Sequence, residues 1–208
     1  MGLPVGYKLL EYIESSGTQY INTGFRPNQN TRVTMELSTS NSGSYTIFGT
    51  DAGWTSNGFA IGVSFGHYGG SNTTSLSGLN DGVKHSVDLN KNSIYIDNVL
   101  KFTFPSATFQ MDTDMVGFAN NRSGAIQELT TMKLYSFKIY DNSTVVRDFI
   151  PCKNSSGEVG LWDDINRKFY SNAGSGNFIA GAVIDFGGIF VKVNGVWKQI
   201  NNVTVNVR

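Results

Sequence analysis

The sequence feature that most constrains the fold is a run of alternating apolar and polar residues within positions 132–152. The large apolar side chains that we expect to point inward are Tyr135, Phe137 and Ile139. A period of two is typical of a strand with one buried face. Residues 141–144, Asp-Asn-Ser-Thr, suit a tight turn, and a second β-rich run follows over 145–150. The pattern predicts a central antiparallel hairpin whose second strand ends at Pro151, because proline lacks a backbone donor.

Shorter runs with the same period occur along the rest of the chain. Residues 32–37 and 59–65 alternate in the same way, and residues 85–97 have the pattern of a hairpin that turns at 90–92. No long segment shows the 3.6-residue period of an amphipathic helix. Charged residues make up only 15% of the chain, which suits short strands joined by polar turns. The sequence therefore predicts an all-β sandwich or barrel of about a dozen strands.

Composition narrows the class of protein and its partners. Basic and acidic residues are equal at 16 each, without a basic cluster, so we expect no nucleic-acid partner. No apolar run approaches the ~18 residues of a membrane span, so we expect no membrane insertion. The first residues lack a basic region followed by an apolar core, so we expect no signal peptide. The single cysteine, Cys152, ends an apolar strand and is predicted to be a buried, inert thiol.

Several stretches together resemble one family of domains. They are residues 9–24 (LLEYIESSGTQYINTG), 137–141 (FKIYD), 147–152 (RDFIPC) and 160–163 (GLWD) with 169–170 (FY). These stretches resemble the concanavalin A-like, laminin G-like jelly-roll domains of tail, fibre and other virion proteins of tailed bacteriophages and prophages. The resemblance covers about residues 3–181 and is specific for the fold, whereas it says little about a ligand, because one fold hosts many functions.

The resemblance implies both an architecture and a setting. It implies an antiparallel two-sheet jelly-roll sandwich over residues 1–181, of the concanavalin A-like type. It also implies a virion protein that is made in the cytoplasm of a bacterial host and that contacts other virion proteins. Ligands of such sandwiches commonly bind at the loops or on the concave sheet.

Residues 182–208 are predicted to form a separate docking or oligomerisation element, a short C-terminal β-meander. Asn194-Gly195 is a strong hairpin signal, Gly187-Gly188 suits a hinge, and residues 203–207 could add a third strand. A ribbon of this size is marginal alone, so we expect it to pack on the sandwich or on a partner. The resemblance to fibre proteins favours a homo-oligomer, foremost a trimer. The predicted docking residues are Phe190, Val191, Val193, Val196, Trp197 and Ile200.

The residues that hydrolysis would need are not arranged for it in the sequence. A glycosidase requires two carboxyl groups across the scissile bond, and none of the five glutamates has an acidic neighbour two or four positions later. Asp112 and Asp114 have the right spacing but lie in a predicted loop. The chain has only two histidines to serve as a base, so a nucleophilic triad is unsupported. We therefore expect a non-enzymatic protein, with a glycoside hydrolase as a distant alternative.

Neither a cofactor nor a metal site is predicted. The available His and Cys residues are scattered, which disfavours zinc. A structural calcium ion would find oxygen ligands at Asp163-Asp164 or at Asp112 and Asp114, but no calcium-loop pattern surrounds these residues.

A glycan site is predicted in the loop over residues 51–58. An aromatic ring offers a platform for a sugar, while Asn, Asp and backbone groups fix its hydroxyls. The candidate carbohydrate-binding residues are Asp51, Trp54, Asn57, Tyr68, Asn120, Asn121 and Arg122. An equally weighted interpretation is that Trp54 caps the edge of the core. The expected function is attachment to a glycan on a cell surface or in mucus, and the alternative is purely structural decoration or fibre assembly without a glycan ligand.

Overall fold

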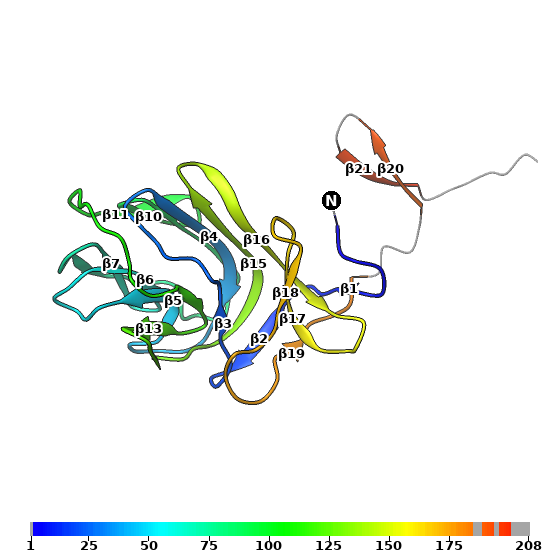
Figure 1. Ribbon diagram of the computed structural model, residues 1–208, viewed down its shortest axis with the longest axis horizontal. Helices are drawn as coiled ribbons and strands as arrows, with labels where there is room; N and C mark the ends of the chain where they lie inside the picture. The colour runs from blue at the N-terminus through cyan, green and yellow to red at the C-terminus, as the bar shows by residue number, and fades with distance from the viewer. Residues whose placement is uncertain (1, 185–188, 194–195, 201–208) are drawn as a thin grey trace, which may run out of the picture.

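Two β-sheets packed face to face form the body of the protein (Figure 1). The computed structural model describes residues 2–184, 189–193 and 196–200, and describes side chains for 2–184. All its regular elements are strands, and the pairs are antiparallel apart from β13 with β5, which is parallel. The expected all-β class and two-sheet sandwich are confirmed. Within these described ranges no helix is long and apolar enough to cross a membrane.

The larger sheet has 11 strands. In spatial order its main path is β11 (Val99–Thr103), β10 (Ser93–Ile96), β9 (His85–Asn90), β4 (Thr31–Ser38), β15 (Thr131–Asp141), β16 (Thr144–Lys153), β17 (Val159–Asp163) and β18 (Lys168–Tyr170). Three short strands join this path: β1 (Lys8–Leu9) beside β16, β2 (Ile13–Ser16) beside β15, and β19 (Ile179–Ala180) beside β2.

The smaller sheet has 8 strands and covers the inner face of the larger one. Its main path is β14 (Ala125–Gln127), β13 (Asn120–Arg122), β5 (Thr46–Asp51), β6 (Gly58–Gly62), β7 (Phe65–Tyr68) and β8 (Thr73–Ser75). Beside this path, β12 (Val116–Gly117) pairs with β5, and β3 (Ile21–Asn22) pairs with β12.

The hairpin predicted from the alternating run is confirmed as the centre of the larger sheet. β15 pairs antiparallel with β16 on one side and with β4 on the other. Phe137 and Ile139 are fully buried, as the period of two requires. The predicted hairpin at 85–97 is confirmed as well, because β9 and β10 pair around residues 91–92.

Two details of the predicted hairpin are wrong. Tyr135 does not point into the core, because the register of β15 against β4 shifts between Leu134 and Ser136. Such a bulge turns one extra residue outward, so Leu134 is fully buried and Tyr135 is only partly buried. The second strand also does not end at Pro151: β16 continues to Lys153. Proline removes only a donor, and its carbonyl still accepts a bond of 3.0 Å from the Leu10 amide.

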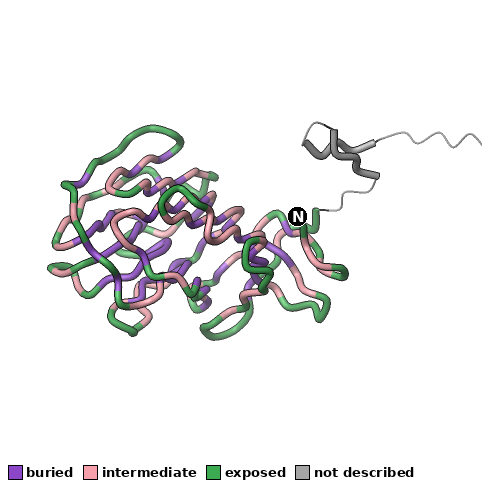
Figure 2. Tube along the Cα trace, turned by 45° about the horizontal axis from the view of Figure 1, so that its top comes forward, coloured by how far each residue is buried: buried purple, intermediate pink, exposed green. Residues whose placement is uncertain are grey.

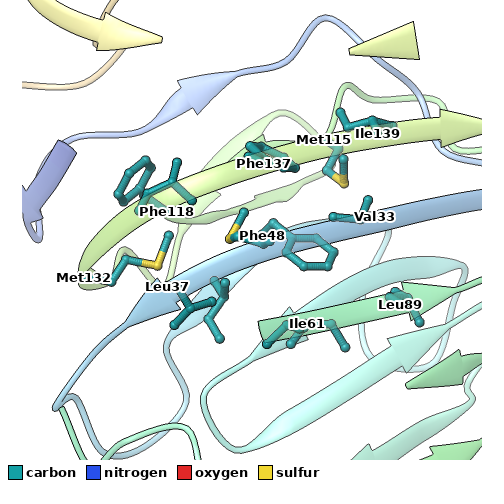
Figure 3. Packing of buried hydrophobic residues seen from close by; sticks show 14 of the residues in the cluster. Val33, Leu37, Phe48, Ile61, Leu89, Met115, Phe118, Met132, Phe137 and Ile139 are labelled. Atoms are coloured by element: carbon teal, nitrogen blue, oxygen red, sulfur yellow. The ribbon is translucent and has the colours of Figure 1, made fainter. Parts of the chain in front are cut away.

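Large aromatic and aliphatic side chains fill the space between the sheets (Figure 3). Phe48 of the smaller sheet stacks on Phe137 of the larger one, with ring centroids 6.3 Å apart. Phe149, which is opposite Phe137 in the neighbouring strand β16, packs on it with ring centroids 5.1 Å apart. Figure 2 shows these buried stretches running through the middle of the body, with exposed residues gathered at the turns. Truncating one such ring to alanine typically costs about 3–5 kcal/mol.

The described body extends to Ile184, three residues beyond the boundary expected at 181. Val183 forms a bridge with Leu10, and the Ile184 amide donates to the Leu9 carbonyl at 2.9 Å. Further along, β20 (Ile189–Val193) and β21 (Val196–Ile200) form a separate two-stranded antiparallel ribbon, as the hairpin signal predicts. The expected third strand at 203–207 lies outside the described residues, as do the side chains of the predicted docking residues.

Candidate functional site

Two of the predicted site segments meet at one corner of the smaller sheet. β5 ends at Asp51, a loop follows, and β6 begins at Gly58. β13 lies parallel to the end of β5, with Arg122 in register with Asp51. The pairing brings the 51–58 loop and the 120–122 strand together, although they are about 70 positions apart in the sequence.

The Asp51 carboxylate is the buried centre of this corner. It is 2% exposed and accepts hydrogen bonds from Arg122 Nε at 2.8 Å, Arg122 Nη2 at 3.2 Å and the Gly53 amide at 2.8 Å. The Asn120 side-chain amide is a further donor, at 2.5 Å. Burial on its own would raise the pKa of Asp51, but the bonds from Arg122, Asn120 and Gly53 outweigh it and hold the pKa below its ordinary value. Asp51 is therefore an ionised, fully engaged group that holds the corner together.

Arg122 links the buried carboxylate to the surface. Its Nη2 also donates to Glu128 at 3.2 Å, and its Nη1 donates to Gln127 at 3.1 Å. The hydrogen bond to Asp51 is the main reason that the pKa of Arg122 is raised above its ordinary value. Two carboxylates share its single positive charge, so the guanidinium presents no net positive charge to a ligand.

Trp54 lies over this pair and is partly embedded. Arg122 Cζ is 5.5 Å from the centroid of the indole, and the His67 ring stacks on it nearly parallel at 5.9 Å. Phe65 contacts the indole edge-on at 4.8 Å. The tryptophan is nevertheless 39% exposed. It therefore packs against the outer side of the smaller sheet and still offers an accessible aromatic surface.

His67 is the buried support beneath the indole. Its Nε2 lies 2.9 Å from the Gly70 carbonyl and 3.2 Å from the Ser56 carbonyl, so this nitrogen carries the hydrogen. A Cβ at Gly58 would lie 2.2 Å from His67 Nδ1, which explains why glycine opens β6. The histidine thus fixes the C-terminal end of the loop that bears Trp54, and it is not placed as a surface base.

A polar cleft of about 400 Å³ opens beside the corner. It is lined by Asp51, Ala52, Ser56, Asn57, Gln110, Met111, Asp112, Thr113 and Ser123. Asp112 and Ser123 are exposed, and neither side chain has a hydrogen-bond partner among residues 2–184. The Asn57 side-chain oxygen accepts from the Gly70 amide at 2.9 Å, which leaves its NH2 group free to donate. The cleft therefore combines free donors with free acceptors.

The other predicted residues serve the scaffold in this structure. Tyr68 is buried, and its hydroxyl donates to the Gln29 carbonyl at 3.1 Å. Asn120 is fully buried, and Asn121 bridges the Asp114 carbonyl at 2.8 Å and the Gly124 amide at 2.9 Å. Of the seven predicted residues, Trp54, Asn57 and Arg122 are the ones that offer accessible side-chain surface at this corner.

Sequence reasoning missed Gln110, Asp112 and Ser123 as residues of this cleft. The spacing in the sequence links Asp112 only to Asp114, which here pairs with Arg26 at 3.2 Å. Residues 110–113 lie between β11 and β12 in a segment without strand pairing beyond one isolated bridge at Gln110. No local period marks such a segment, so only the tertiary structure places it at the cleft.

Asp51 and Asp112 line the same cleft, although the sequence offered no spaced carboxylate pair there. A glycosidase needs one of its two carboxyl groups protonated, as a general acid with a raised pKa. The pKa of Asp51 is instead lowered, and its oxygens are occupied by Arg122, Asn120 and Gly53. Asp51 is therefore not placed to serve as that acid, whereas the exposed Asp112 is placed to accept hydrogen bonds from hydroxyl groups.

Metal-binding geometry is absent from the part of the chain that the structure describes: no group of three or more His, Cys, Asp or Glu side chains is arranged to hold an ion. Asp163 is buried and accepts bonds from the Asp148 and Ile165 amides, while Asp164 pairs with Arg167 at 2.6 Å. Cys152 is buried, and burial raises the pKa of its thiol to about 12.

In comparisons with known proteins, no family model and no curated protein matches the chain.

Proposed function

We propose that this chain is a non-enzymatic, virion-associated binding module that holds a glycan at the Trp54 corner. The observation that carries the proposal is an exposed indole, braced by Arg122 and His67, at the same corner as a polar cleft. Apolar faces of sugar rings pack on aromatic rings, and sugar hydroxyls need both donors and acceptors. Trp54 supplies the first, and Asn57, Asp112 and Ser123 supply the second.

The dimensions of the cleft suit a short stretch of glycan. Its volume of about 400 Å³ lies in the lower part of the range of small-molecule sites, roughly 300–1,000 Å³. Its walls come from three separate segments, two of which are tied to the sheet by the Asp51–Arg122 pair. Such a preorganised site loses little conformational entropy when a ligand binds.

The jelly-roll topology and the phage setting belong to the same proposal. The sequence resemblance over residues 3–181 supports both. A sheet in which β9, β4 and β15 are neighbours despite their separation in the chain further supports the jelly-roll topology. A second candidate function is structural decoration or fibre assembly without a ligand. The extra ribbon β20–β21, which is not part of either sheet, favours that alternative.

The experiment that tests glycan binding compares three variants on an array of bacterial surface polysaccharides and mucin glycans. Trp54→Ala should weaken binding at least severalfold, because a stacked ring contributes on the order of 1 kcal/mol. Asp112→Asn should also weaken binding, because it removes a carboxylate that accepts hydrogen bonds from sugar hydroxyls. Phe102→Ala is the matched control, since Phe102 is a similarly exposed aromatic, at 37%, that does not line the cleft. Equal binding by all three variants, or no binding by the parent protein, would refute the proposal. New reducing ends that disappear in Asp112→Asn would instead establish a hydrolase.

A further inference from the structure

The wall of the polar cleft at the Trp54 corner carries charge of one sign. Its lining residues, all of which belong to the described body, include two carboxylates, those of Asp51 and Asp112, and none of them is Lys, Arg or His. The remaining polar side chains of the lining are amides and hydroxyls, those of Ser56, Asn57, Gln110, Thr113 and Ser123. Every charged side chain in the wall is therefore an anion.

Two arginines bond to carboxylates in or next to this wall, and both are neutralised there. Arg122 is shared between Asp51, at 2.8 Å, and Glu128, at 3.2 Å. Arg26 pairs with Asp114 at 3.2 Å, directly after the lining residues 110–113. These carboxylates already outnumber the guanidinium groups, so neither arginine is a spare cation for an acidic ligand.

Asp112 adds a negative charge that no side chain of residues 2–184 balances. It is exposed in the cleft and forms no ion pair within that range, whereas Asp51 is 2% exposed and held by Arg122. An ammonium group is a compact cation with three donors, which suits such a carboxylate. The carboxylate, sulfate or phosphate of an acidic sugar would instead be repelled by Asp112, because like charges meet there.

From these observations we propose that the glycan held at the Trp54 corner carries a free amino group, which binds the Asp112 carboxylate as an ammonium ion. The inference rests on the proposed function, since it names the class of sugar that the same site takes. Trp54 offers the aromatic surface on which a sugar ring packs, and the free NH2 group of Asn57 donates to a hydroxyl. Because both the ammonium and Asp112 are charged, their bond gains a Coulomb attraction that a neutral hydroxyl lacks.

Paired glycans that differ in charge test the proposal with the full-length chain. A chitosan oligomer has free amino groups, and the chitin oligomer of the same length lacks the charge because its amines are acetylated. A cello-oligosaccharide and its uronic acid form add neutral and acidic members, and any natural glycan that binds is also compared before and after chemical N-acetylation. We expect amine-bearing forms to bind on the order of tenfold more tightly than acetylated ones, and acidic forms to bind least. The preference should shrink as salt is added, because salt screens exposed charges.

Variants of Asp112 test whether this carboxylate recognises the charge. Asp112→Asn should abolish the preference for the amine-bearing form, and Asp112→Lys should reverse it in favour of the uronic acid form. Glu11→Gln is the matched control, because it also removes one negative charge from an exposed side chain but lies outside the cleft. The control should keep the full preference. Melting temperatures should agree among the parent and the three variants, since the side chains of Asp112 and Glu11 form no ion pair within residues 2–184.

The outcomes separate this inference from the proposed function. If neutral or acidic glycans bind as tightly as amine-bearing ones, the corner is a glycan site and the amine assignment is wrong. If the preference for amines persists in Asp112→Asn, another group recognises the charge and the role of Asp112 is wrong. Binding that a chelator abolishes would make a metal ion the partner of Asp112 and would also overturn the inference. Failure to bind any glycan, charged or neutral, would refute the proposed function, and this inference with it.

Discussion

Removal of the Asp51 carboxylate is the sharpest test of how the corner is held together. Asp51→Ala leaves three groups without their acceptor: the Asn120 amide, the Gly53 amide and the Arg122 guanidinium. Deleting one partner of a buried ion pair typically costs about 3–5 kcal/mol. Arg122 keeps Glu128 as a partner and its side chain is 24% exposed, so the lower end of that range applies. We expect a loss of about 3 kcal/mol in the free energy of unfolding.

The assay is equilibrium unfolding in urea, followed by thermal unfolding. For a chain of this size, 3 kcal/mol lowers the melting temperature by roughly 6–12 °C. Asp148→Ala is the matched control: Asp148 forms an ion pair of similar length with Lys138, 2.8 Å, but at the surface. Surface pairs contribute about 0–1 kcal/mol, so the control should change stability little. A loss below about 1 kcal/mol for Asp51→Ala would refute the view that Asp51 organises the corner.

The pH dependence gives a second, independent check on Asp51. Its pKa in the folded protein lies below the ordinary value of 3.8, so the folded state favours the ionised form. The stabilisation is therefore present above about pH 3.8, and it is lost as the pH falls through the lower folded pKa. Asp51→Asn removes this titration. The difference in stability between the parent and Asp51→Asn should shrink as the pH is lowered below that value.

Three further predictions concern stability and reactivity. His85 bonds to Asp97 at 2.7 Å and to Asp81 at 2.9 Å, and the Asp97 bond is the main reason that its pKa is raised above 6.5. This contribution is complete below pH 6.5 and lost as the pH rises through the higher folded pKa, so His85→Gln should flatten the stability profile of the parent above pH 6.5. Phe137→Ala should cost about 3–5 kcal/mol in urea unfolding. Cys152, with its pKa near 12, should react with a thiol reagent only under denaturing conditions.

The period-two pattern predicted the strands well because burial of one face is a local property of a sequence. The clean alternation at 32–37 became β4, whose inward residues Val33, Met35 and Leu37 are buried. The pattern could not reveal the bulge at Tyr135, because a register shift depends on how β15 meets β4. It also could not reveal that Pro151 stays within β16. That depends on whether a neighbouring strand requires a hydrogen bond from the backbone N–H that proline lacks.

The candidate site was only partly predictable for a related reason. The loop at 51–58 stood out because Trp54 is an isolated aromatic among polar residues. Its contact with Arg122 depends on the parallel pairing of β13 with β5, a long-range event without a local signal. Asp112 reaches the cleft from an irregular segment, and its role is visible only once the sheets are assembled.

The structure separates two kinds of polar residue that look alike in the sequence. Asp51 is buried and bonded within the chain, so its substitution should weaken any binding indirectly, by releasing Arg122 and lowering stability. Asp112 is exposed and lacks a bond to another residue of the described body, so its substitution should weaken binding while leaving stability unchanged. A buried polar group must find its partners inside the fold, and an exposed one in a cleft remains free for a ligand. The contrast between Asp51 and Asp112 therefore distinguishes the scaffold of the corner from the surface that would meet a sugar.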